Sequence, residues 1–169
     1  CEDETNVLVN GTNVQNAASY IWTSTTGTGT TISNATSLTP IVTPSLTDIT
    51  NNYIDLTITA IPNAPCSNNE TKIVRIPIQK KASVSTGAAQ TICEGNIITT
   101  TGALSSNVTN LTWNNNGGDG TFTTSNLNTI TEYTPGPIEI ANGSVSLTLT
   151  ADAIAPCVGT VSATVQHLI

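Results

Sequence analysis

Two stretches of the chain alternate strictly between apolar and polar residues. Ile54, Leu56 and Ile58 fall on one face of the first stretch, and the second repeats this pattern with Val145, Leu147 and Leu149. Successive side chains of a β-strand point to opposite faces, so this period of two predicts strands with one buried face. Shorter runs between Asn- and Gly-rich turns predict further strands at 84–92, 97–101, 108–114, 121–124, 129–133 and 160–169.

The two alternating stretches are copies within a repeat whose offset is 91 residues. The same offset places Trp22 on Trp113 and the Ala-Pro-Cys of 64–66 on that of 155–157, while Cys1 falls on Cys93 with one extra residue. The repeat predicts a boundary near Lys81 and two domains, 1–81 and 82–169. Because residues 82–92 have no counterpart before Cys1, we expect the first domain to lack its opening strand.

Roughly seven short strands in about 90 residues, without any helical period, predict a small Greek-key sandwich. The expected fold is therefore all-β, with two tandem Ig-like β-sandwich domains. A short helical turn is expected after Pro44 and after Pro135, just before each long strand. Ser45 with Asp48 three residues later resembles a capping box, and Gly136 breaks that pattern in the second copy.

Composition narrows the class of function. Only 9% of the residues are charged, with 33 Thr and 19 Asn in the uncharged polar set, and four Lys and Arg against eleven Asp and Glu give a net charge of −7. An acidic chain is a poor partner for nucleic acid or for an anionic membrane. No apolar run is long enough for membrane insertion. We expect no enzyme activity.

The four cysteines, Cys1, Cys66, Cys93 and Cys157, are widely spaced, and none forms a C-x-x-C motif. With His167 as the single histidine, zinc, haem and thioredoxin-type centres lack ligands. Three pairings are possible, and disulfides imply an oxidising, extracytoplasmic location. The favoured pairing is within each repeat, Cys1–Cys66 and Cys93–Cys157; each bond would close about 65 residues and stabilise the fold by about 4 kcal/mol.

Each of the other candidate sites has a structural interpretation beside the functional one. Asp119, in the Gly-rich loop, is a weak candidate for a Ca²⁺ ligand, but Thr28 holds the matching position and a tight turn is favoured, so no cofactor is expected. The acidic run 2–4 is interpreted as a solvated loop, with a calcium site between domains as the alternative. Trp22 and Trp113 are assigned to the cores rather than to sugar stacking. A catalytic role for His167 is not expected, because no titratable partner is near it in the sequence.

All four basic residues lie within ten positions of one another beside the predicted boundary: Lys72, Arg75, Lys80 and Lys81. One hypothesis is an interdomain basic patch that contacts an acidic face of the next repeat. The favoured alternative is a solvated last strand and linker.

Between Cys93 and Cys157 the second copy contains, in order, Cys-Glu-Gly, Leu-Thr-Trp, Gly-Asp-Gly-Thr-Phe, Tyr-Thr-Pro and Ala-Pro-Cys. This set resembles the tandem Ig-like and PKD-like repeats of giant cell-surface adhesins in Bacteroidetes. The copy departs from the PKD core pattern, because the Phe position is lost and three asparagines intervene. The resemblance implies type IX secretion, a cell-surface filament and gliding motility. It implies neighbouring repeats of the same chain as partners, with gliding machinery or surface polysaccharide bound through other segments.

Two classes of function follow from these observations. The favoured one is a structural stalk segment of a very large secreted adhesin, in which each module contacts only its neighbours. The alternative is a carbohydrate-binding accessory module of a secreted hydrolase or adhesin.

Overall fold

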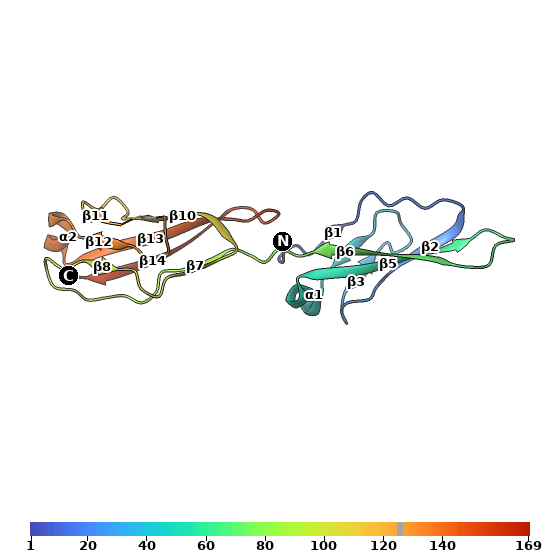
Figure 1. Ribbon diagram of the computed structural model, residues 1–169, viewed down its shortest axis with the longest axis horizontal. Coiled ribbons are helices and arrows are strands. Elements are labelled where there is room, and N and C mark those ends of the chain that lie inside the picture. The colour runs from blue at the N-terminus through green and yellow to red at the C-terminus, as the bar shows by residue number, and fades with distance from the viewer. Residues whose placement is uncertain (125–126) are drawn as a thin grey trace. The chain divides into compact units, whose positions relative to one another are not determined.

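The computed structural model describes residues 1–124 and 127–169, and the chain divides into two compact units. Unit 1 is Cys1–Lys80 and unit 2 is Lys81–Ile169. Strands dominate both units, with one helix of six residues in each (Figure 1). The prediction of an all-β fold is confirmed.

Unit 1 contains two antiparallel sheets of three strands each. One sheet has the order β2-β5-β6 and the other β1-β4-β3. The helical turn α1 leads directly into β5, the longest strand of the unit. The elements are β1 (Val7–Leu8), β2 (Ala17–Ser24), β3 (Thr31–Ser33), β4 (Ile41–Thr43), α1 (Leu46–Asn51), β5 (Tyr53–Pro62) and β6 (Glu70–Pro77).

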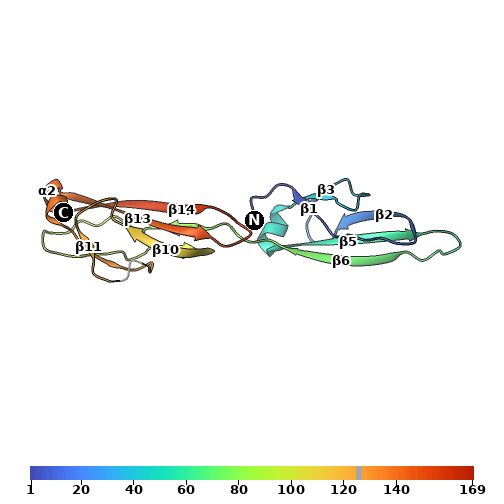
Figure 2. The ribbon, with the colours of Figure 1, turned by 90° about the horizontal axis from the view of Figure 1, so that it is seen from above.

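Unit 2 contains the sheets β10-β13-β14 and β11-β12-β8, together with a two-stranded pair β7-β9. The antiparallel strands β13 and β14 run side by side over their whole length (Figure 2). The elements are β7 (Ser83–Ser85), β8 (Ile98–Thr99), β9 (Leu104–Ser106), β10 (Val108–Asn114), β11 (Thr121–Phe122), β12 (Glu132–Thr134), α2 (Pro137–Asn142), β13 (Ser144–Ala153) and β14 (Thr160–Leu168).

The repeat in the sequence is a repeat of elements. The bounds of β12, α2 and β13 equal those of β4, α1 and β5 plus 91, as 137 − 46 = 91 shows for the helices. Both helices end in a left-handed residue, Asn52 with φ 64° and Gly143 with φ 68°. The predicted helical turns are confirmed. Strands β7 and β9 have no strand counterpart in unit 1, all of whose residues are described.

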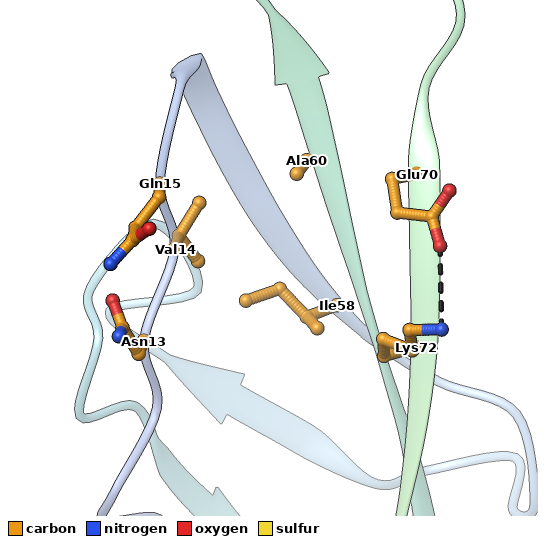
Figure 3. Close-up of a pocket in the computed structure, with 7 residues that line it drawn as sticks. All are labelled: Asn13, Val14, Gln15, Ile58, Ala60, Glu70 and Lys72. Carbon is orange, nitrogen blue, oxygen red and sulfur yellow. Dashed lines mark ion pairs between the residues drawn. The ribbon is translucent and has the colours of Figure 1, made fainter.

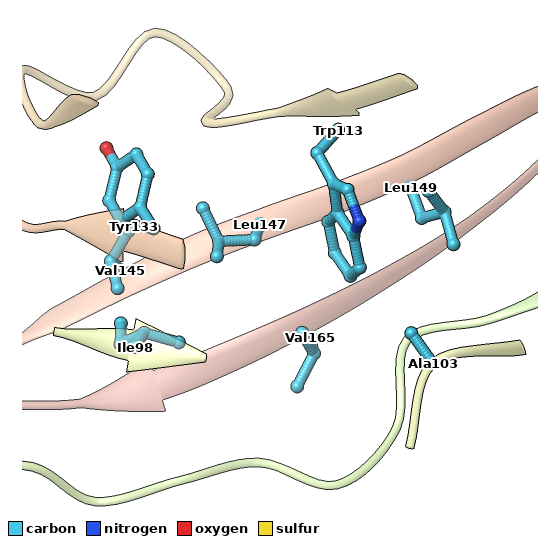
Figure 4. Close-up of a cluster of buried hydrophobic side chains, with 8 residues drawn as sticks. All are labelled: Ile98, Ala103, Trp113, Tyr133, Val145, Leu147, Leu149 and Val165. Atoms are coloured by element: carbon cyan, nitrogen blue, oxygen red, sulfur yellow. The ribbon is translucent and has the colours of Figure 1, made fainter. Parts of the chain in front are cut away.

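Each unit has a core of its own between its two main sheets. In unit 2 the alternating residues of β13, Val145, Leu147 and Leu149, are at most 3% exposed, as their period of two predicts (Figure 4). They pack with Trp113 of β10 and, from the facing sheet, Tyr133 of β12. The core of unit 1 consists of Val9, Trp22, Val42, Ile54, Leu56, Ile58 and Ile78.

Several predicted strands have different limits. The strand expected at 84–92 stops at Ser85, because Gly87 has a φ of +77° and lies so close to Thr101 that a Cβ would overlap the carbonyl oxygen of that residue. Beyond this break the chain returns to the sheet only as a bridge from Thr91 to Leu168. The strand expected at 129–133 is β12, which starts at Glu132, and β9 was not predicted at all.

Candidate functional site

A buried carboxylate at the start of the helical turn accepts hydrogen bonds from three donors of unit 1. Asp48 is fully buried, and its Oδ2 accepts from the backbone N–H of Ser45 (2.8 Å), from Ser45 Oγ (2.7 Å) and from Thr30 Oγ1. In return Ser45 Oγ accepts from the Asp48 N–H at 3.2 Å. This reciprocal pair is a capping box with Asp in place of Glu, so that prediction is confirmed.

The same hydrogen bonds control the charge of this carboxylate. Burial acts most strongly and would raise the pKa of Asp48, because it disfavours the ionised form. The hydrogen bonds from Thr30 and from Ser45 oppose burial and together outweigh it. The net effect is a pKa below the ordinary value, so Asp48 is ionised at neutral pH.

Unit 2 places a longer carboxylate at the same repeat position. Glu139 is 6% exposed, and its Oε2 accepts from the Gly136 N–H at 3.0 Å. The hydroxyl of Tyr133 donates to the two carboxylate oxygens at 2.9 and 3.0 Å. Asn115 donates in turn to the Tyr133 hydroxyl at 3.2 Å. The carboxylate therefore joins the helical turn to the aromatic core.

Gly136 has no side chain with which to cap α2, and Asp119 takes over that task. Its Oδ2 accepts from the Ile138 N–H at 2.9 Å, and its Oδ1 accepts from the Glu139 N–H at 3.3 Å. Asp119 thus caps a helical turn from a separate loop. Sequence reasoning missed this role, although the repeat contains the signal: unit 1 pairs Thr28 with Ser45 where unit 2 pairs Asp119 with Gly136.

The Gly-rich loop is required for this close packing. A Cβ at Gly118 would overlap Glu139 Oε1, and a Cβ at Gly120 would lie 2.6 Å from the Tyr133 hydroxyl. The equivalent Gly27 in unit 1 makes room for Ser45 and Asp48 in the same way.

Tyr133 is held in its protonated form. Burial is the main cause and raises the pKa of Tyr133, and the adjacent Glu139 raises it further. The hydrogen bond from Asn115 lowers this pKa but does not outweigh them, so that the pKa of Tyr133 rises to about 12. A phenol that stays protonated is a permanent donor to the carboxylate. The network is thus suited to holding the loop, the helical turn and the core together.

His167 of β14 is 1% exposed, and its Nδ1 accepts from the Gln90 N–H at 3.1 Å. Burial lowers the pKa of His167, which favours the neutral ring.

Within the described ranges, no group of three or more His, Cys, Asp or Glu side chains could hold a metal ion. No helix among these residues is long and apolar enough to cross a membrane.

The two tryptophans lie inside the units. Trp22 is 2% and Trp113 1% exposed, and each indole N–H donates to a backbone carbonyl, that of Ser37 and of Asn128 respectively, at 3.1 Å. Their ring faces are therefore covered and present no stacking surface for a sugar.

The predicted pairing of cysteines within each repeat is not present. Cys66 and Cys93 have free, exposed thiols, whereas Cys1 and Cys157 are disulfide-bonded. Sequence reasoning assigned each pair to neighbouring loops, but the strand order puts those loops at opposite ends of a sheet. The paired stretch of β5 and β6 alone spans seven residue steps, or about 24 Å, against the 4.4–6.8 Å between Cα atoms that a disulfide needs.

The basic residues are not gathered into one patch in unit 1. Arg75 makes a bidentate pair with Asp55 at 2.8 and 2.7 Å, and its guanidinium lies 3.8 Å from the centre of the Tyr53 ring. Lys72, three residues before Arg75 in the same extended strand, forms an exposed ion pair with Glu70 at 3.4 Å. Lys80 and Lys81 follow β6. An interdomain role for the four residues stays a prediction.

The acidic run at the start of unit 1 is mostly solvated. Asp3 and Glu4 are exposed, while the backbone N–H of Glu2 donates to the Gln79 carbonyl at 2.9 Å. Calcium binding by these residues or by Asp119 stays untested.

Unit 1 has a pocket of about 190 Å³ beside β5 and β6, with the Glu70–Lys72 pair at its rim (Figure 3). None of its lining residues is aromatic, and they are Asn13, Val14, Gln15, Ile58, Ala60, Glu70 and Lys72. The segment 13–15 corresponds to β9, which in unit 2 pairs with β7. Strand β7 also packs on β14, and this packing covers Val165 to 8% exposure, whereas the equivalent Val74 is 40% exposed. The pocket therefore lies where unit 2 holds its opening strand.

Comparison with solved structures finds tandem extracellular cadherin domains. The chain aligns with protocadherin gamma C5 EC1-3 at a TM-score of 0.45 and 10% identity, over 98% of this chain and 56% of that one. The alignment with protocadherin gamma B2 domains 1–5 has a TM-score of 0.43 and 12% identity, and it covers 88% of this chain and 32% of that one. The alignment with mouse protocadherin-24 EC1-3 has a TM-score of 0.39 and 11% identity, and it covers 99% of this chain and 71% of that one. The chain thus spans about a third to just over half of the first two structures.

The comparisons by sequence find no relative. No protein-family model matches the chain, and no curated protein matches it.

Proposed function

We propose that this chain is a structural, non-enzymatic stalk segment of a very large secreted adhesin at the cell surface. The observation that carries the proposal is the duplication itself: α1, β4 and β5 recur as α2, β12 and β13 at a constant offset of 91. A chain that repeats one module element by element builds length rather than a single reactive centre. Strands of ten residues at about 3.3 Å per residue give each module a reach of about 33 Å.

The polar network supports the same role. In both units the buried carboxylate is occupied by donors from its own unit, among them Ser45 and Thr30 in unit 1 and Gly136 and Tyr133 in unit 2. Carboxylates held in this way inside a unit stabilise the module, and their burial keeps them from exchanging a proton with a substrate.

The finer proposal follows from the resemblance to bacterial adhesin repeats. It assigns the chain to a gliding-motility adhesin of the type of flavobacterial SprB, exported by type IX secretion and extending from the outer membrane as a filament. Its direct partners are neighbouring repeats of the same chain. Gliding machinery or surface polysaccharide is contacted by other segments, and no cofactor is required.

The gene that encodes the chain tests this proposal. Sequencing outward on both sides is expected to find further copies with a period near 91 residues. A flanking catalytic domain without further copies would contradict the stalk and favour a carbohydrate-binding accessory module. A glycan array probed with the chain gives a second readout, in which specific binding would favour that same alternative.

A further inference from the structure

Each unit carries a cysteine near either end of its long antiparallel sheet. We call the end at which the chain enters a unit its incoming end, and the end at which the chain leaves its outgoing end. In unit 2 the chain enters at Lys81, whose carbonyl accepts from Asn107 Nδ2 at 3.2 Å. Asn107 also accepts from the Ile154 N–H at 3.3 Å, and Ile154 starts the turn that contains Cys157. Cys157 therefore lies at the incoming end.

Cys93 lies at the other end of the same unit. The preceding residue, Ile92, donates its N–H to the Leu168 carbonyl at 2.9 Å, and Leu168 is the last residue of the final strand. The C-terminus, marked C in Figure 1, lies at the end of unit 2 opposite to the turn between β13 and β14. Cys93 is thus the outgoing-end cysteine.

Unit 1 has the same arrangement. Cys1 lies at its outgoing end, because the adjacent Glu2 N–H donates to the carbonyl of Gln79, just before the last residue of the unit. Cys66 lies at the incoming end, in the turn between β5 and β6, where its N–H donates to the Asn63 carbonyl at 3.1 Å. Figure 1 shows the N-terminus at the end of unit 1 opposite to this turn.

The bonding states differ between equivalent positions. Cys1, at an outgoing end, and Cys157, at an incoming end, are both disulfide-bonded. Their repeat equivalents, Cys93 and Cys66, have exposed free thiols. Both cysteine positions of the repeat are thus able to form disulfides, and neither can reach the other within one unit.

We propose that Cys93 and Cys66 are inter-repeat disulfide sites. Cys93 bonds the incoming-end cysteine of the repeat that follows, and Cys66 bonds the outgoing-end cysteine of the repeat that precedes. The partner in each case is another module of this kind, so the inference rests on the proposed tandem array. A disulfide then joins each of these units to its outer neighbour in addition to the peptide chain, which suits a stalk under tension.

The chemistry is ordinary thiol–disulfide exchange with an oxidised dithiol or a small-molecule disulfide as the oxidant. The Cys93 thiolate attacks one sulfur of that oxidant and expels a thiolate. The thiolate of the partner cysteine then attacks the mixed disulfide, forms the inter-repeat S–S bond and releases the second thiolate. Two thiols lose their protons and two electrons, and the oxidant leaves as two thiols.

A fusion of two copies of the whole chain, joined through residues 79–92, tests the proposal. This linker restores the repeat spacing, because residue 92 directly precedes Cys93, the equivalent of Cys1. The single chain has two free thiols, so independent copies would have four. After refolding with oxidised glutathione, alkylation is expected to detect only two, Cys66 of the first copy and Cys93 of the second. Peptide mapping without reductant is expected to recover Cys93 of the first copy linked to Cys66 of the second.

The matched control is Cys93→Ser in the first copy only, which is expected to leave three free thiols. The indole N–H resonances of the tryptophans report whether every unit is folded. Four free thiols in a folded fusion, or a Cys66–Cys66 link, would overturn the proposal and leave the stalk proposal intact. Conversely, a gene without flanking copies would contradict the stalk proposal, and it would not change the number of free thiols measured in the fusion.

Discussion

Asp119 occupies the space that a side chain at Gly136 would need. A Cβ on Gly136 would lie 2.5 Å from Asp119 Oδ1, and the Asp119 carboxylate makes the two cap hydrogen bonds that Gly136 cannot make. The equivalent residues in unit 1, Ser45 and Thr28, show the other solution, in which the cap is local. The two units thus cap equivalent helical turns from different positions of the repeat. The capping side chain comes from the residue before the helix in unit 1, and in an exchange of roles it comes from the Gly-rich loop in unit 2.

The exchange predicts coupling between these two positions. Asp119→Thr removes a cap and is expected to lower the free energy of unfolding of unit 2 by about 1 kcal/mol. Gly136→Ser alone is expected to cost about 1–3 kcal/mol, because the new side chain overlaps Asp119. The double variant restores the residue pair of unit 1 and is expected to cost at least about 0.5 kcal/mol less than the sum. Urea denaturation followed through the Trp113 indole resonance measures all three, and strict additivity would contradict the exchange.

Asp48→Asn is expected to destabilise unit 1 by about 1–3 kcal/mol at pH 7, because the groups around Oδ2 are donors that need an anionic acceptor. The pKa of Asp48 is lowered from 3.8 in the folded state, so its contribution is complete above that value and is lost as the pH falls through the folded pKa. The difference between parent and variant is therefore expected to shrink below pH 3.8. Exposed Asp3→Asn is the control, and an equal effect of both variants would sink the assignment.

His167 predicts a second pH dependence, in unit 2. Because burial depresses the pKa of His167 from 6.5, the unfolded chain takes up the proton first, and stability is expected to fall as the pH drops below about 6.5. Unit 1 has Ile76 at the equivalent position, which makes His167→Ile the natural control. This variant is expected to flatten the stability of unit 2 between pH 7 and 5, measured by urea denaturation. If the free energy of unfolding depended on pH equally in the parent and in the variant, groups other than His167 would be responsible for that dependence.

Tyr133→Phe tests the hydrogen bond to the buried carboxylate. Loss of a donor to Glu139 is expected to lower the free energy of unfolding of unit 2 by about 1.5–3 kcal/mol, while the ring continues to fill the core. Tyr53→Phe in unit 1 keeps the ring beneath Arg75 and is expected to change stability by less than about 0.5 kcal/mol. Thermal unfolding of both variants provides the comparison, and similar losses would argue against a special role for Tyr133.

The pocket of unit 1 predicts that an added opening strand will fill it. Residues 82–92 fused in front of Cys1 are expected to raise the free energy of unfolding of unit 1 by about 1–2 kcal/mol, because the added strand covers Val74 and buries its own valine. The control is Val84→Asp within the added copy, which should remove the gain. Protection of the Trp22 indole N–H from hydrogen exchange reports on unit 1 alone. No gain in protection would mean that the pocket does not accept the strand.

Much of the fold could be predicted because its signals are local. The period of two in 54–58 and 145–149 depends only on which face of a strand is buried, and the capping box depends on residues three positions apart. The prediction of one strand over 84–92 was wrong for a non-local reason. Gly87 packs against Thr101, and this contact cannot be recognised from either segment alone. The cap from Asp119 was missed for the same reason, since it joins a loop to a helical turn 19 residues away.

The sequence alone predicts the duplication, the alternating strands, the buried tryptophans and the polar, weakly charged surface, because each follows from composition or from short periodic spacing. Which loops are neighbours, in contrast, depends on the folded structure. Cys1 and Cys66 belong to one repeat, yet strand order and direction send them to opposite ends of a sheet. Which end a loop reaches depends on how all the strands pair, and that is a property of the folded sheet rather than of any segment in it.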